Sequence, residues 1–209
     1  MREIKVRGTA TGTRMPDWIE ISIEIISENP EYQTVMEDVE ERTSTLKQEL
    51  VDAGFRLDQI KTKNFSVETQ YSYEDHKKYF IGYRAVHEML LEFPYRNERL
   101  DEAVMTLAGS TSRPDFSIKF TLEDESELIN QTLALAIKDA KTKAIVIAES
   151  LGVQLGEILE VNYQSDFVSP RDVMIIENKS MSFSAQSFTP GDVEVKQSVY
   201  VVWQIEGKY

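Results

Sequence analysis

The sequence predicts an α+β protein in which helices cover one side of an antiparallel sheet. The first observation is the alternation of apolar and polar residues, typical of half-buried strands and clearest over residues 17–27. The second is a pair of segments, 31–53 and 124–151, in which apolar residues recur every three or four positions, as on one face of a helix. The third is that glycine or proline stands at most of the boundaries between segments, which separates the two periodicities into distinct elements.

The composition is that of a globular protein large enough to bury a core. The chain has 209 residues, of which 41% are hydrophobic and 28% are charged. Its formal net charge of −13 disfavours binding to nucleic acids and to anionic membranes. The absence of cysteine excludes disulfides, thiolate zinc sites and a cysteine nucleophile. No apolar run approaches the ~18 residues of a membrane span, so we expect no membrane insertion.

Two strands and a helix are expected first. Residues 3–9 alternate as a short strand, and residues 8–16 are expected to form a turn because they contain two glycines and a proline. The strand at 17–27 has one apolar face, formed by Ile19, Ile21, Ile23 and Ile25. A proline precedes the helix expected at 31–53, and a glycine follows it.

A hairpin, a second helix and another strand come next. Residues 61–73 and 79–93 alternate, and the polar run between them indicates the hairpin turn. A short helix is expected at 97–109 and a strand at 116–122. Residues 17–122 therefore have the order strand-helix-strand-strand-helix-strand, the ferredoxin-like βαββαβ arrangement.

A long helix and two further strands extend this arrangement. The expected buried face of the helix contains Ile129, Leu133, Ile137, Ala140, Ala144, Ile147, Ala148 and Leu151. Alanines at every fourth position let the helix lie close to a sheet, so we expect Ala144 to be buried. Asp124 begins a capping-box pattern at the start of this helix. The last two strands are expected at 157–164 and 195–205.

Residues 165–192 lack either periodicity and are expected to form an irregular loop within a single domain spanning residues 1–209. A loop of this length in a compact domain is usually functional or mobile. Its apolar side chains either fold back on the core or contact a partner or a second copy of the chain. The candidate interaction residues in this loop are Met174, Ile176, Met181, Phe183 and Phe188.

Few residues suggest chemistry. His76 lies at the expected hairpin turn and His87 on an apolar strand face, and neither has a second ligand at metal-binding spacing. Residues 8–13 resemble a phosphate loop only superficially, because a strand follows them and they contain no lysine. No nucleophile motif is visible. We therefore expect no catalytic residues, no cofactor and no metal, and we interpret the protein as not an enzyme.

Several blocks of the chain match one family pattern in the same order. The most specific block is Ala140-x3-Ala144-x3-Ala148 followed by Leu151-Gly152-Val153. The others are Gly8 to Gly12 with Pro16-Asp17, Ile60-Lys61-Thr62 with Phe65-Ser66-Val67, Tyr71-x-Tyr73, and Gly82-Tyr83-Arg84-Ala85. Together they cover nearly the whole chain, which on these residues resembles the SIMPL-domain family.

The resemblance implies interaction rather than catalysis. The family is named for a protein that associates with a signalling kinase. Its bacterial members are mostly exported, some are linked to oxidative stress and some are antigens; no enzymatic activity is established, and some members form ring-like homo-oligomers. We therefore expect a self-assembling or protein-interaction module related to stress. The alternative is a small-molecule-binding protein or an unrecognised enzyme with a site under the 165–192 loop. Because the usual signal peptide is lacking, we expect a cytoplasmic location.

Overall fold

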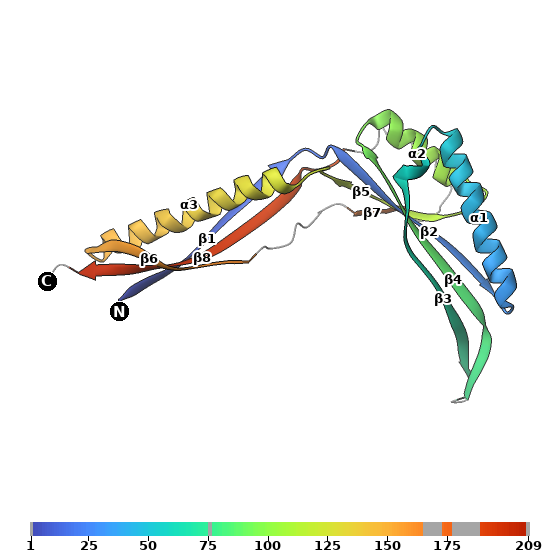
Figure 1. Ribbon diagram of the computed structural model, residues 1–209, viewed down its shortest axis with the longest axis horizontal. Coiled ribbons are helices and arrows are strands. Elements are labelled where there is room, and N and C mark those ends of the chain that lie inside the picture. Colours follow the sequence, from blue (N-terminus) through green and yellow to red (C-terminus); the bar gives the residue numbers. More distant parts are fainter. Residues whose placement is uncertain (1, 75–76, 165–172, 177–188, 208–209) are drawn as a thin grey trace. The chain divides into compact units, whose positions relative to one another are not determined.

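The computed structural model describes residues 2–74, 77–164, 173–176 and 189–207 (Figure 1). The chain, which we expected to form a single domain, divides into two compact units, here called the central unit and the terminal unit. The central unit contains Pro16–Thr121 and Asp172–Pro190. The terminal unit contains Met1–Met15, Leu122–Arg171 and Gly191–Tyr209, so both ends of the chain belong to it.

The central unit has the βαββαβ order that we expected for residues 17–122. Its elements are β2 (Trp18–Asn29), α1 (Tyr32–Asp52), β3 (Ile60–Glu74), β4 (Lys77–Pro94), α2 (Asn97–Gly109) and β5 (Asp115–Thr121), with a 3-10 turn at Leu57–Gln59. The sheet order is β3-β4-β2-β5-β7, and every neighbouring pair is antiparallel. The predicted α+β class is therefore confirmed, and the first four strands in this sheet have the ferredoxin-like arrangement.

The fifth strand of this sheet comes from the range 165–192, which we expected to be irregular throughout. Val173–Ile176 forms β7, which pairs with β5 so that Met174 lies opposite Ile118. Four residues are too few to show a periodicity, and the strand exists because the edge of β5 offers it a partner. The rest of the expected loop, apart from residues 189–192, lies outside the described residues.

Both helices of the central unit pack on one face of its sheet (Figure 1). On that face β2 contributes four side chains that are almost fully buried, namely Ile19, Ile21, Ile23 and Ile25. Helix α1 buries Val35, Val39, Thr43, Leu46 and Leu50. The opposite face is polar and carries ion pairs such as that between Lys119 Nζ and Glu20 Oε2, at 2.8 Å. The alternation in β2 therefore separates a core face from a solvated face, as we expected.

The terminal unit is a three-stranded antiparallel sheet covered by one long helix. Its elements are β1 (Glu3–Arg14), α3 (Ser126–Ser150), β6 (Val153–Gln164) and β8 (Val193–Gly207), and the sheet order is β1-β8-β6. Strand β1 pairs with β8 along the whole length of β1, from Glu3 opposite Gln204 to Arg14 opposite Val193. The prediction of a turn at residues 8–16 was therefore wrong for residues 8–14, which continue the strand. The two glycines in this range lie where α3 packs on β1.

The buried face of α3 differs from the one that we expected. Its buried side chains follow a strict spacing of four: Leu128, Thr132, Ala136, Ala140, Ala144 and Ala148. The burial of Ala144 is confirmed, but Ile137 and Ile147 are 48% and 38% exposed. Just before the helix, Asp124 Oδ1 accepts a hydrogen bond of 2.8 Å from the Ser126 N–H, where we expected a cap. The larger aliphatic side chains therefore do not form the main contact with the sheet.

Two glycines of β1 explain why α3 packs through alanines. A Cβ atom on Gly8 would lie 2.6 Å from the Cβ of Ala140, and one on Gly12 would lie 3.0 Å from Leu128 Cδ1 and would also overlap the Thr132 hydroxyl. Protein interiors leave no space for such atoms. Helix and strand therefore approach closely along a line where only glycine and small side chains fit, and bulky residues of α3 point elsewhere.

The outer edge of β1 is bonded by two polar side chains of α3. The Thr9 N–H donates to Asp139 Oδ2 at 2.8 Å, and Lys143 Nζ donates to the Arg7 carbonyl oxygen at 3.3 Å. Lys143 and Asp139 also pair with each other at 2.6 Å. The hydrogen bonds from Lys143 and Thr9 hold the pKa of Asp139 below its usual value. These contacts satisfy part of an edge that would otherwise be free to pair with another chain.

Candidate functional site

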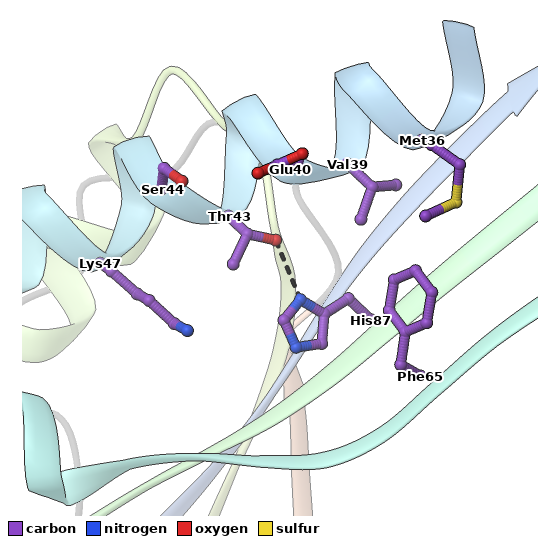
Figure 2. A pocket seen from close by; sticks show the side chains of 8 residues that line it. All are labelled: Met36, Val39, Glu40, Thr43, Ser44, Lys47, Phe65 and His87. Atoms are coloured by element: carbon purple, nitrogen blue, oxygen red, sulfur yellow. Dashed lines mark hydrogen bonds between the residues drawn. The ribbon is translucent and has the colours of Figure 1, made fainter. Parts of the chain in front are cut away.

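A cavity of about 370 Å³ opens in the central unit between α1 and the strands β3 and β4. This volume is at the small end of the range of known ligand sites. Its lining, drawn in Figure 2, consists of Met36, Val39, Glu40, Thr43, Ser44, Lys47, Phe65 and His87. The six residues from α1 recur at helical spacing and so share one side of that helix. The cavity exists because α1 packs on β2 and β4, while β3 lies at the edge of the sheet.

His87 lies at the base of this cavity and is buried. Its Nδ1 is hydrogen-bonded to Thr43 Oγ1 at 2.9 Å, and its Nε2 to Thr62 Oγ1 at 3.0 Å. Burial, and secondarily the positive charge of Lys47, lower the pKa of His87, which favours the neutral imidazole. Since both ring nitrogens are engaged by threonines, His87 is a satisfied core histidine, as its place on an apolar strand face indicated.

The two ends of the cavity differ in polarity. Figure 2 shows Lys47 on one side of His87, and Met36 and Phe65 on the other. The ring of Phe65 meets the imidazole edge to face, with centroids 5.5 Å apart. Lys47 is half-buried, and no ion pair joins it to any acidic side chain among the described residues. The cavity therefore combines an apolar floor with one uncompensated cation.

Among the lining residues, Ser44 and His87 do not form the hydrogen-bonded pair that an activated serine nucleophile needs. Ser44 is exposed on α1, and the hydrogen bonds of His87 go to Thr43 and Thr62 instead. Across the described parts of the chain, no group of three or more histidine, aspartate or glutamate side chains could hold a metal ion. His76, the other histidine, lies outside the described residues.

A second, more polar cavity of about 310 Å³ lies near the start of α1, lined in part by Asp38 and Arg42. The Arg42 guanidinium donates to the carbonyl oxygens of Ile26 and Ser112, at 2.6 and 2.7 Å, and also pairs with Asp38 at 3.3 Å. Because Arg42 is already saturated by these partners, it holds α1 to its neighbours, and we interpret this cavity as structural.

An exposed row of aromatic rings lies on the β3–β4 hairpin and the start of α1, and we call it the aromatic strip. It consists of Tyr32, Tyr83, Phe80 and Tyr71, which meet edge to face with successive centroid distances of 5.4, 5.2 and 5.9 Å. The ammonium of Lys78 lies 3.6 Å from the centroid of the Tyr71 ring. Tyr32, Phe80 and Tyr71 are all exposed, Phe80 to 49%.

The strip is uncovered because the strands are longer than the helix above them. Strands β3 and β4 have 15 and 18 residues, which at about 3.3 Å per residue extend roughly 50 and 60 Å. Helix α1 has 21 residues and reaches only about 31 Å at 1.5 Å per residue. The far end of the hairpin therefore has no helix to bury its rings.

A second exposed apolar area lies on β6 in the terminal unit, and we call it the β6 surface. It consists of Ile158, Val161 and Tyr163, which are all exposed. Val161 and Tyr163 lie opposite Val201 and Val199, whose side chains pack against α3. Helix α3 lies close to β1, at the other edge of this sheet, and on β6 its core reaches Val153 and Leu155, so the residues of the β6 surface stay exposed.

Neither surface contains the residues that we singled out from the sequence. Of the candidate interaction residues, Met174 and Ile176 lie in β7, where only the backbone is described, and Met181, Phe183 and Phe188 lie outside the described residues. The two predicted hairpin strands are longer than the predicted helix at 31–53, and from this difference the uncovered rings of the aromatic strip could have been predicted.

Comparison with known proteins adds a family but no activity. The family model described as "SIMPL: Protein of unknown function (DUF541)" matches residues 4–203. A search of curated proteins found no significant match. Among the helices of the described residues, none is both long and apolar enough to cross a membrane.

Proposed function

We propose that this chain, which belongs to the SIMPL family, is a non-enzymatic module that assembles with further copies of itself through the aromatic strip. The observation that carries the proposal is the continuous row of edge-to-face rings that runs from the start of α1 onto the far end of the β3–β4 hairpin, which no described helix covers. Large exposed apolar areas are unusual on monomers, and aromatic residues are enriched at the centres of interfaces. Because these rings already order one another, association costs less side-chain entropy.

The proposed partner of the strip is the β6 surface of a second copy. The β6 surface is apolar, and the exposed Glu157 and Glu160 lie next to Ile158 and Val161 on the same edge strand, whereas the strip ends at the ammonium of Lys78. Opposite charges beside two apolar surfaces favour this pairing over contact between two strips. Since each copy carries one surface of each kind, it can contact two neighbours, which is the head-to-tail arrangement that builds rings or filaments. The ring-like oligomers and stress link of the family agree with this proposal by resemblance alone.

Native mass spectrometry and light scattering over a dilution series test the proposal. The unmodified chain should form an oligomer, and Phe80→Glu should dissociate it, because a carboxylate cannot enter an apolar interface without a partner. The matched control is Met105→Glu, which introduces the same charge at an exposed position of α2. A strict monomer at every concentration, or equal oligomers in the two variants, would contradict the proposal.

A charge exchange tests the choice of partner. Lys78→Glu and Glu160→Lys should each weaken the oligomer, because each places like charges at the contact, and the double variant should recover it. Val161→Glu should dissociate the oligomer as strongly as Phe80→Glu does. If Val161→Glu leaves the assembly unchanged while Phe80→Glu abolishes it, the strip contacts something other than the β6 surface.

A further inference from the structure

We propose that the cavity beside His87 binds a small amphipathic monocarboxylate, with its carboxylate on Lys47 and its apolar body against Val39 and Phe65. None of these residues belongs to the aromatic strip or the β6 surface. The site is therefore separate from the proposed assembly contacts, and either proposal can fail without the other.

Lys47 provides the reason for an anionic ligand. Acidic residues outnumber basic ones by 36 to 23, and lysines such as Lys61, Lys119 and Lys143 form ion pairs. Lys47 is half-buried at the wall of the cavity, yet no described carboxylate pairs with it. An ammonium beside apolar side chains gains more from an anion than one surrounded by water does, because water screens it less. Its uncompensated charge also extends to His87, where it contributes to the lowered pKa of the imidazole.

The other end of the cavity provides the reason for an apolar body. Val39 is buried beneath it, Phe65 forms an exposed wall, and Met36 can adapt its shape to what it contacts. The two nitrogens of His87 are occupied by Thr43 and Thr62, so the imidazole offers a ligand its ring carbons rather than a hydrogen bond. A hydrocarbon or aryl group is therefore the best fit to this floor.

The one acidic group in the lining sets the orientation of the ligand. Glu40 is exposed and lies seven residues before Lys47, which places the two about 10 Å apart along the axis of α1. A carboxylate bound at Lys47 leaves an uncharged tail near Glu40, whereas the reversed orientation would bring two anions together. An amine would prefer Glu40, but that side chain is already solvated and gains less from pairing.

The test compares three probes of equal chain length: hexanoate, hexanamide and hexylamine. The chain has only two histidines, so the NMR signals of the His87 ring are readily assigned and report binding at this cavity. We expect hexanoate to shift these signals and to bind about tenfold or more tightly than hexanamide, because its hydrogen bond to Lys47 joins two charges. Lys47→Met should remove this difference, and Lys47→Arg should retain most of it.

The matched control is Lys138→Met, which removes a lysine from the terminal unit and should leave hexanoate binding unchanged. Phe65→Ala should weaken hexanoate and hexanamide by the same factor. The proposal is overturned if saturating hexanoate leaves the His87 signals unmoved, if hexanoate and hexanamide bind equally, or if hexylamine binds most tightly. Should Lys47→Met fail to fold, Lys47→Gln compared with Lys47→Arg gives the same decision.

Discussion

A methyl group added at Gly8 should destabilise the terminal unit by about 1–3 kcal/mol, the usual cost of overpacking. The new Cβ would lie 2.6 Å from both the Cβ and the backbone nitrogen of Ala140, and it would also press on the Ala136 carbonyl oxygen. Ordinary carbon–carbon contacts are about 3.5–4.0 Å, so α3 would have to move by roughly 1 Å. Replacing glycine also restricts the unfolded chain, which offsets only about 0.4–1 kcal/mol of this cost.

Urea unfolding followed by circular dichroism measures the effect, since a change in midpoint at constant slope reports stability alone. Gly109→Ala is the matched control, because nothing lies within 4 Å of a Cβ atom added at this last residue of α2. That variant should be unchanged or up to about 1 kcal/mol more stable, through the same restriction of the unfolded chain.

A double-mutant cycle identifies the clash. Ala140→Gly removes one of the atoms that the Gly8→Ala methyl group would meet, so Gly8→Ala should cost less in that background, with a coupling of about 0.5 kcal/mol or more. If Gly8→Ala alone is as stable as the unmodified chain, the close contact between β1 and α3 is wrong. If the two changes are strictly additive, the clash is not with the Ala140 Cβ.

Four further predictions concern buried and titrating groups. Ala144→Leu should cost about 1–3 kcal/mol in urea unfolding, because Ala144 is fully buried between α3 and the sheet; unchanged stability would contradict the role of the helix as a cover for the sheet. The lowered pKa of Asp139 contributes stability above its unfolded pKa of about 3.9 that is lost as the pH falls through the folded value, so the unmodified chain should lose more stability than Asp139→Asn between about pH 5 and 2. The lowered pKa of His87 means that the unfolded state binds the proton more readily, so stability should fall as the pH drops below about 6.5, and His87→Gln should remove that slope. An NMR titration of Lys47→Met should show the pKa of His87 raised but still below its usual value, because burial is the larger cause; an unchanged pKa would show that the charge of Lys47 has no effect.

The local pattern of apolar and polar residues was sufficient to predict the helices and most of the strands of the central unit. The alternation in β2 and the helical spacing in α1 placed the buried side chains correctly, because in each case bulky apolar residues occur only on the face that the core covers. The candidate site was not predictable in the same way. The sequence placed His87 on an apolar strand face, but its neighbours Thr43, Lys47 and Phe65 come from other elements. The spacing of residues within one element does not predict which other elements pack against it.

The sequence by itself determined the family, the α+β class and the order of the elements, since alternation and helical spacing depend only on residues that are close along the chain. Only the tertiary structure decided how those elements are used. From the sequence, Gly8 was predicted to lie in a turn, but in the structure it lies in β1 against Ala140, which is far along the chain. The aliphatic residues of α3 were predicted to be core, but the close contact at the β1 glycines leaves space only for small side chains such as alanine. The aromatic strip depends on the relative lengths of packed elements, and whether a carboxylate of the described residues pairs with Lys47 depends on contacts in three dimensions. Contacts between distant segments obey sterics and charge in three dimensions, which a linear pattern does not record.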